Sequence, residues 1–455
     1  MRYFLDSLFD ALLVLVLFIA TMMLTIPTSA QQSDKSAASV VKPTPAATNQ
    51  PQQLQESLES LLRANSHPFR IDNGKLAGEG ANLLASAMHN VQFVAMGEWH
   101  NRRAMHHFAT ALFRHLHERQ GFNYFALEED PYLSKLSSRA ARDGGRPAML
   151  KLGQRYPNAF HLYTESQLDM LADIGSMSKG ATDPIWGLNQ VFGAAHIYER
   201  LVKIAPDANA RAVAQKMLDQ ALEYEKERFQ KNTQYIANIA KQEDFDQLRA
   251  AFRPKAGSEA EWLIEQTALS NRIFSPFVTK PRPPSPVFYK SWVTRETNMK
   301  HLFADRYREA QAKGDKLPKV LAFFGGFHLY RGLSESTDIY TLGNFLSELA
   351  IFNKMQSFQI FTIVDDPDVR KGWQGPIAQV ASEVAANSKV EGKAAEAVII
   401  DLRPLIPFAR RSKELDPNIR RLILGYDVFV VMRDSELGSL EKLKTPKFRW
   451  YPEGN

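Results

Sequence analysis

The sequence predicts an α/β fold in which a mostly parallel central sheet is flanked by helices. Short apolar runs, bounded by Gly or by polar residues, alternate along the chain with segments of helical periodicity. Of the 455 residues, 44% are hydrophobic, which is enough for one large core or for two ordinary ones. A long segment, residues 207–275, is rich in helix-forming residues and separates two of the strand-like runs.

The stretch from Val91 to Asp130 predicts a strand, a helix and a second strand. Residues 91–96 are apolar and precede Gly97, as expected of a buried parallel strand. Apolar residues then recur at helical spacing over residues 102–119. The second strand covers residues 124–127 and is followed by three consecutive acids. We interpret this unit as the centre of the fold.

Five further apolar runs have the length of strands, and they cover residues 184–188, 319–324, 357–364, 397–402 and 427–432. Between the first two of these runs, Asp207 to Ile273 is rich in Ala, Glu, Lys, Gln and Leu. This composition predicts two or three amphipathic helices in an insertion that spans residues 207–275. We expect the insertion to roof the carboxyl edge of the sheet.

The N-terminal region predicts export. Arg2 precedes an apolar run from Ala11 to Ile26, and small residues follow up to Ala30, which is typical of a secretory signal that is cleaved after this residue. The alternative is that residues 11–26 remain as a membrane anchor. Residues 31–53 are rich in Gln, Ser, Ala and Pro and indicate a disordered linker, so residues 54–455 are expected to form one periplasmic or extracellular domain.

Composition also excludes several kinds of site and partner. The chain has no Cys, which excludes disulfides, thiolate metal ligands and a Cys nucleophile. Its net charge of +6 is modest for this length, and Lys and Arg are scattered, so no nucleic-acid partner is expected. We expect a small-molecule substrate, and a membrane contact only through an uncleaved N-terminal segment.

The candidate site lies where the expected strands end. In an open parallel sheet the carboxyl ends of the strands share one edge, so Glu98, His100 and Glu128 should converge there. A later apolar strand ends at two glycines and then places His328 in the same way. Two imidazoles and a carboxylate can activate water for hydrolysis, and Arg103 or a backbone N–H could hold the developing oxyanion.

The residues alone are also compatible with other kinds of site. A divalent metal could be held by His100, Glu128 and His328, and a haem could take an axial His. No cofactor is firmly indicated. The remaining alternative is a structural or interaction module that has lost its activity.

Several short motifs occur in a fixed order, and they are GEWHNRR, ALEED, IWGLNQ, RETNM, FFGGFHLYRG and TLGNFL. Their order resembles that of the erythromycin esterase-like proteins, within a superfamily that includes ChaN-like haem-binding and Tiki-like proteins. The resemblance covers roughly residues 54–364. It implies that His100 is the base that activates water and that Glu98 and Glu128 orient it or the substrate. By the same resemblance Arg103 would stabilise charge and His328 would complete the site.

Some positions differ from the esterase pattern. Gly325 stands where the esterases carry another His, and Asn189 stands where they usually carry Asp. The GGFH block is closer to the ChaN and Tiki branches, and the adjacent His106 and His107 are similar to a pair in the ChaN helix. The leading hypothesis is therefore an exported hydrolase that cleaves an ester or related acyl bond, and the alternative is a haem- or metal-binding surface protein without turnover.

Overall fold

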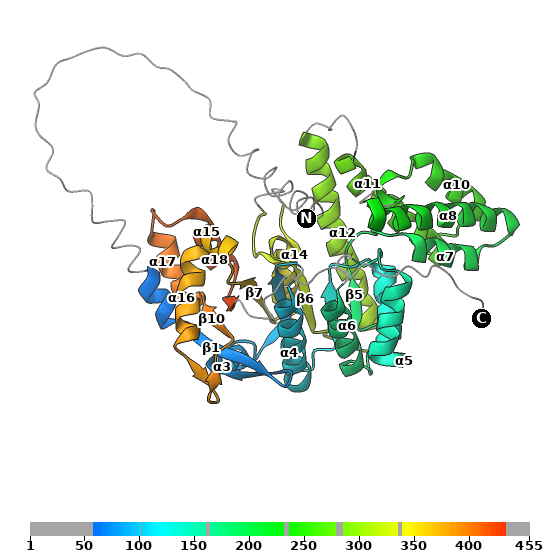
Figure 1. Cartoon of the computed structure of the whole chain (residues 1–455). Coiled ribbons are helices and arrows are strands. Elements are labelled where there is room, and N and C mark those ends of the chain that lie inside the picture. The colour runs from blue at the N-terminus through cyan, green and yellow to red at the C-terminus, as the bar shows by residue number, and fades with distance from the viewer. Residues whose placement is uncertain are drawn as a thin grey trace, which may run out of the picture. The chain divides into compact units, whose positions relative to one another are not determined.

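A nine-stranded sheet organises the part of the chain that the computed structural model describes, which comprises residues 58–100, 102–160, 164–231, 236–278, 285–334 and 339–433. The expected signal segment and linker lie outside these residues. The sheet order is β2-β1-β10-β11-β7-β3-β6-β4-β5 (Figure 1). Its strands are β1 (Ser66–Asp72), β2 (Lys75–Gly78), β3 (Val91–Glu98), β4 (Tyr124–Leu127), β5 (Ile185–Gly187), β6 (Val320–Gly325), β7 (Gln356–Val364), β10 (Ala397–Asp401) and β11 (Val428–Met432).

The predicted mostly parallel sheet is confirmed. From β11 through β7, β3, β6 and β4 to β5, every neighbouring pair runs parallel. The remaining pairs, β2 with β1, β1 with β10 and β10 with β11, run antiparallel. A small second sheet pairs β8 (Lys389–Val390) with β9 (Lys393–Ala394).

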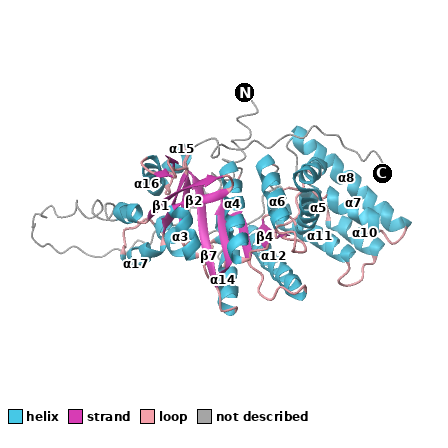
Figure 2. Ribbon diagram, turned by 90° about the horizontal axis from the view of Figure 1, so that it is seen from below, coloured by secondary structure: helices cyan, strands magenta, loops and turns pink. Residues whose placement is uncertain are grey.

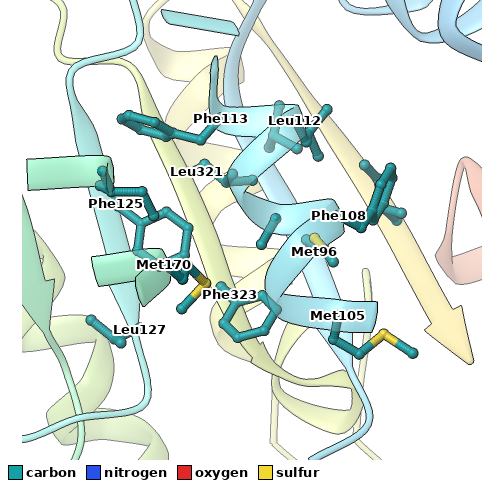
Figure 3. Close-up of a cluster of buried hydrophobic side chains, with 14 of the residues drawn as sticks. Met96, Met105, Phe108, Leu112, Phe113, Phe125, Leu127, Met170, Leu321 and Phe323 are labelled. Carbon is teal, nitrogen blue, oxygen red and sulfur yellow. The ribbon is translucent and has the colours of Figure 1, made fainter. Parts of the chain in front are cut away.

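Helices cover both faces of the sheet. One face carries α3 (Glu79–Ala87), α4 (Arg103–Gln120), α5 (Pro131–Arg155) and α6 (Glu165–Met177). Figure 3 shows how Phe108 and Leu112 of α4 pack against Met96, Leu321 and Phe323 of the sheet. The other face carries α12 (Ser285–Ala312) and α14 (Leu342–Phe352). The helical spacing within residues 102–119 thus gives the buried face of α4.

The C-terminal part of the sheet packs against α16 (Gly375–Ala386), α17 (Ile406–Arg411) and α18 (Pro417–Gly425). Three short elements complete this part of the chain, namely α13 (Gly326–Leu329), α15 (Pro367–Lys371) and the 3-10 helix η1 (Arg403–Leu405).

The insertion between β5 and β6 is helical, as predicted. It contains α7 (Ala195–Ile204), α8 (Ala208–Lys231), α9 (Ile236–Ile239), α10 (Gln242–Phe252) and α11 (Glu259–Val278), and it has a hydrophobic core of its own. Figures 1 and 2 show α7, α8 and α10 beyond α5, on the side of the sheet where β5 lies. The next helix, α12, returns to the sheet. It places residues 295 and 296 at the carboxyl edge of the sheet. Among the described residues, every helix is too short or too polar to span a bilayer.

Candidate active site

Strand register brings the sequence-predicted residues to one edge of the sheet. Glu98 of β3 pairs with Gly325 of β6, and Leu127 of β4 pairs with Phe323 of β6. The residues that follow these strand ends therefore project from neighbouring positions. The chain after β6 can approach β3 closely because Gly97 has no side chain, since a Cβ there would lie 2.9 Å from the Cα of Gly326.

His100 is held by a carboxylate. Its Nδ1 lies 2.6 Å from Oε1 of Glu98, whose side chain is only 3% exposed. Burial of the ring opposes its protonation, but the charge and hydrogen bond of Glu98, helped by Glu128, outweigh this and raise the pKa of His100 to about 9. The ring is therefore an imidazolium in most molecules at neutral pH, and it becomes neutral only as the pH rises through about 9.

Glu128 lies between the two histidines. One carboxylate oxygen, Oε2, lies 3.9 Å from Nε2 of His100 and accepts the backbone N–H of Gly325 at 3.2 Å. The other, Oε1, lies 4.0 Å from Nε2 of His328 and forms an ion pair with Arg295. The side chain of Glu128 is 6% exposed, so this carboxylate depends on its partners for its charge.

Arg295 of α12 joins the parts of the site. Its Nη2 donates to Glu128, its Nη1 donates to Nε2 of His328 at 3.1 Å, and its Nε donates to Oε1 of Gln190 at 3.0 Å. Oδ1 of Asn189 accepts from both Nε and Nη2. The buried, planar guanidinium of Arg295 thus donates hydrogen bonds to side chains from three different segments of the chain.

The hydrogen bonds of His328 define its tautomer. Because the guanidinium of Arg295 can only donate, Nε2 of His328 accepts, and its Nδ1–H donates to Oε2 of Glu296 at 2.6 Å. Glu296 also accepts the backbone N–H of Leu342 at 2.5 Å. Burial opposes the charge of Glu296, but its interactions with His328 and Leu342 outweigh this and lower its pKa. His328, held by Glu296, therefore orients Arg295.

Space next to His100 depends on a glycine. A Cβ on Gly325 would lie 3.3 Å from Nε2 of His100 and 3.5 Å from Oε2 of Glu128. Gly325 has φ −50° and ψ 134°, which other residues also adopt, so its backbone conformation does not require glycine. The missing side chain instead keeps room beside the two polar atoms.

The remaining sequence-predicted residues lie elsewhere. Arg103 is exposed on the first turn of α4, and the arginine that contacts Glu128 is Arg295. His106 is buried, with Nδ1 2.6 Å from Oγ of Ser166, and burial lowers its pKa to about 4. His107 is exposed. Consecutive helical residues point in different directions, so His106 and His107 do not offer a haem one shared face.

The arrangement of charges does not fit a bound divalent metal. Among the described residues, no group of three His, Cys, Asp or Glu side chains is placed to hold a metal ion. The physical reason is Arg295, whose guanidinium donates to both Glu128 and His328, two of the three ligands that the sequence suggested. A cation between these side chains would face a buried positive charge.

Comparison with known proteins supports the fold. Solved structures with similar folds include a succinoglycan biosynthesis protein, with 14% identity, a TM-score of 0.50 and coverage of 84% of this chain and 97% of that one. They also include an erythromycin esterase variant, EreC, in its open conformation, with 12% identity, a TM-score of 0.50 and coverage of 83% and 99%. A Bacillus cereus protein has 16% identity and a TM-score of 0.48, and covers 83% and 97%.

No protein-family model matches the sequence, and no curated protein matches it. At these identities, the structural likeness establishes an erythromycin esterase-like fold. The reaction therefore has to be inferred from the residues of the candidate site.

Proposed function

We propose that the protein is a hydrolase that cleaves an ester or a related acyl bond with water activated by His100. The observation that supports this most is the separation of 3.9 Å between Nε2 of His100 and Oε2 of Glu128, where Gly325 leaves room for a water that contacts both. The esterase-like fold supports the same class of reaction. Glu98 fixes the ring by accepting its Nδ1–H, as the acid of a hydrolase triad does.

The proposed reaction has two proton transfers. Neutral His100 takes a proton from water on Nε2 while the water oxygen bonds to the acyl carbon. The tetrahedral intermediate then breaks its bond to the leaving alkoxide, and the imidazolium returns the proton to that oxygen. Glu98 stabilises the imidazolium, and Arg295 holds Glu128 in place.

The experiment that tests this function is hydrolysis of p-nitrophenyl acetate by the purified chain, with and without EDTA. We expect turnover that survives the chelator. Loss of activity with EDTA and its return with a divalent ion would instead favour the metal reading. An intense Soret band after addition of haem, without any ester turnover, would favour the binding protein.

We further propose that the protein acts outside the cytoplasm. The apolar run from Ala11 to Ile26 and the small residues before Gln31 support this. Mass spectrometry of the chain isolated from an expressing bacterium should show Gln31 as the first residue, in a periplasmic or secreted fraction. An intact N-terminus in the membrane fraction would favour the anchor, and an intact chain in the cytosol would contradict export.

The rate of hydrolysis should rise with pH through about 9, because only the neutral form of His100 can accept a proton from water. The change Glu98→Gln removes the nearest negative charge, so it should move the midpoint of the kcat/KM profile to lower pH. Stopped-flow assays over the alkaline range measure both midpoints. A profile that is flat through this range in the unmodified protein would contradict a role for His100 as base.

The same pKa has a consequence for stability. Because the pKa is raised in the folded state, the contribution of His100 to stability is complete below about pH 6.5 and is lost as the pH rises through about 9.

The change Gly325→Ala should lower kcat/KM by about 100-fold, because its methyl group would displace the attacking water. The backbone at this position accepts alanine, so the unfolding temperature should change little. Gly180→Ala is a matched control, since a Cβ at Gly180 would meet nothing within 4 Å. Unchanged hydrolysis by Gly325→Ala would show that the space beside His100 is not where water reacts.

A further inference from the structure

Five aromatic side chains form a cluster outside the hydrophobic cores of the described chain. They are Phe192, Phe274, Phe277, Phe288 and Trp292. None of them belongs to the four core clusters. Four of them are half-buried, and Phe277 is 44% exposed. We call these residues the aromatic cluster.

Four of the five rings in the aromatic cluster lie on α11 and α12, and Phe192 lies between β5 and α7. Ring centroids of Phe277 lie 5.1 Å from Phe288 and 5.6 Å from Trp292, and both contacts are edge-to-face. Ser291 of α12 donates to the carbonyl of Ile273 in α11, which holds the two helices together. These two helices lie side by side in Figure 1.

The aromatic cluster is continuous with the candidate active site at two points. Trp292 lies under the guanidinium of Arg295, with 5.4 Å between the ring centroid and Cζ. At the second point, Gln190 accepts from Arg295, and Phe192, two residues later, packs against Phe274 at 5.4 Å. A molecule whose acyl carbon lies beside His100 could extend along these rings.

We propose that the aromatic cluster binds a large apolar acyl group of an uncharged ester substrate. This inference rests on the proposed function and specifies its substrate class. The five rings contain one polar ring atom, Nε1 of Trp292, so they offer contact area and few hydrogen bonds. A saturated acyl chain suits such a surface better than a sugar, which requires paired donors and acceptors.

Charge in the site favours an uncharged substrate. Three buried carboxylates, Glu98, Glu128 and Glu296, face the two cationic groups of Arg295 and protonated His100. An additional carboxylate on the substrate would be repelled by these carboxylates, and Arg295 already pairs its charge with Glu128.

The first test compares p-nitrophenyl octanoate with p-nitrophenyl acetate. Each methylene that is half buried should raise kcat/KM about twofold, so the six additional methylenes of the octanoate should give a preference of about 60-fold. Phe277→Ala should lower kcat/KM for the octanoate about fivefold and for the acetate less than twofold. Phe352→Ala is the matched control, because Phe352 is 82% exposed at the end of α14 and belongs to a different helix.

The second test does not need turnover. Methyl octyl ketone has the shape of an ester but cannot be hydrolysed, and calorimetry can compare its binding with that of methyl ethyl ketone. We expect tight binding of the longer ketone only, weakened about fivefold by Phe277→Ala. Equal binding of both ketones, or no effect of Phe277→Ala, would overturn the substrate class. Ketone binding without ester hydrolysis would instead refute the proposed reaction and leave the aromatic cluster as a binding site.

Discussion

The change His100→Ala should lower kcat/KM for p-nitrophenyl acetate by about 1000-fold, because general base catalysis typically contributes a factor of this size. Glu98 and Glu128 remain in the variant, but neither is positioned to replace the imidazole Nε2. The loss should be nearly the same for the octanoate ester, since the aromatic cluster is unchanged. Initial rates at a pH above about 9, where the unmodified ring is neutral, give the full effect.

Two controls separate a chemical role of His100 from a structural one. His301→Ala removes an exposed imidazole on α12 and should leave the rate unchanged. Free imidazole added to His100→Ala should restore part of the rate, because it can occupy the vacated space and accept the proton. Absence of rescue in a variant that unfolds at the normal temperature, together with a rate loss below about threefold, would argue against His100 as base.

Sequence periodicity predicted the central sheet well, because its strands are buried on both faces and read as continuous apolar runs. The hairpin of β1 and β2 was missed. Most residues of these strands are half-buried, so the strands lack such a run. Asn73 and Gly74, both with positive φ, nevertheless give a typical hairpin turn. The Asn-Gly dipeptide could therefore have been used to predict this hairpin. The short α9 within the insertion has too few residues for periodicity to show.

The sequence predicts those residues of the site that lie at the ends of strands. Glu98, His100 and Glu128 follow β3 and β4 directly, so parallel register alone brings them together. Arg295 begins the RETNM motif in the middle of a long helix, but its role depends on how α12 crosses the sheet, which the motif does not show. Arg103 was expected in the site because it lies at the start of the helix that follows His100 and matches the esterase motif, yet its side chain is exposed to solvent. Position at the end of a strand was therefore the better criterion for predicting site residues.

The change Arg295→Met should lower the free energy of unfolding by about 3–5 kcal/mol, the usual cost of leaving a buried charge without its partner. Glu128 would lose its ion-pair partner at a position that is 6% exposed, and His328 would lose the donor that fixes its tautomer. Urea unfolding followed by circular dichroism measures the change. Activity should fall as well, because Glu128 would no longer be held beside His100.

Matched variants identify the cause of this destabilisation. Arg146→Met removes an arginine whose partners Glu165 and Asp169 are exposed, so its unfolding midpoint should stay close to that of the unmodified protein. The double variant Arg295→Met with Glu128→Gln removes both charges and should recover most of the stability but none of the activity. If the double variant were as unstable as Arg295→Met alone, the loss would come from packing against Trp292, and the buried ion pair would not be what holds the site together.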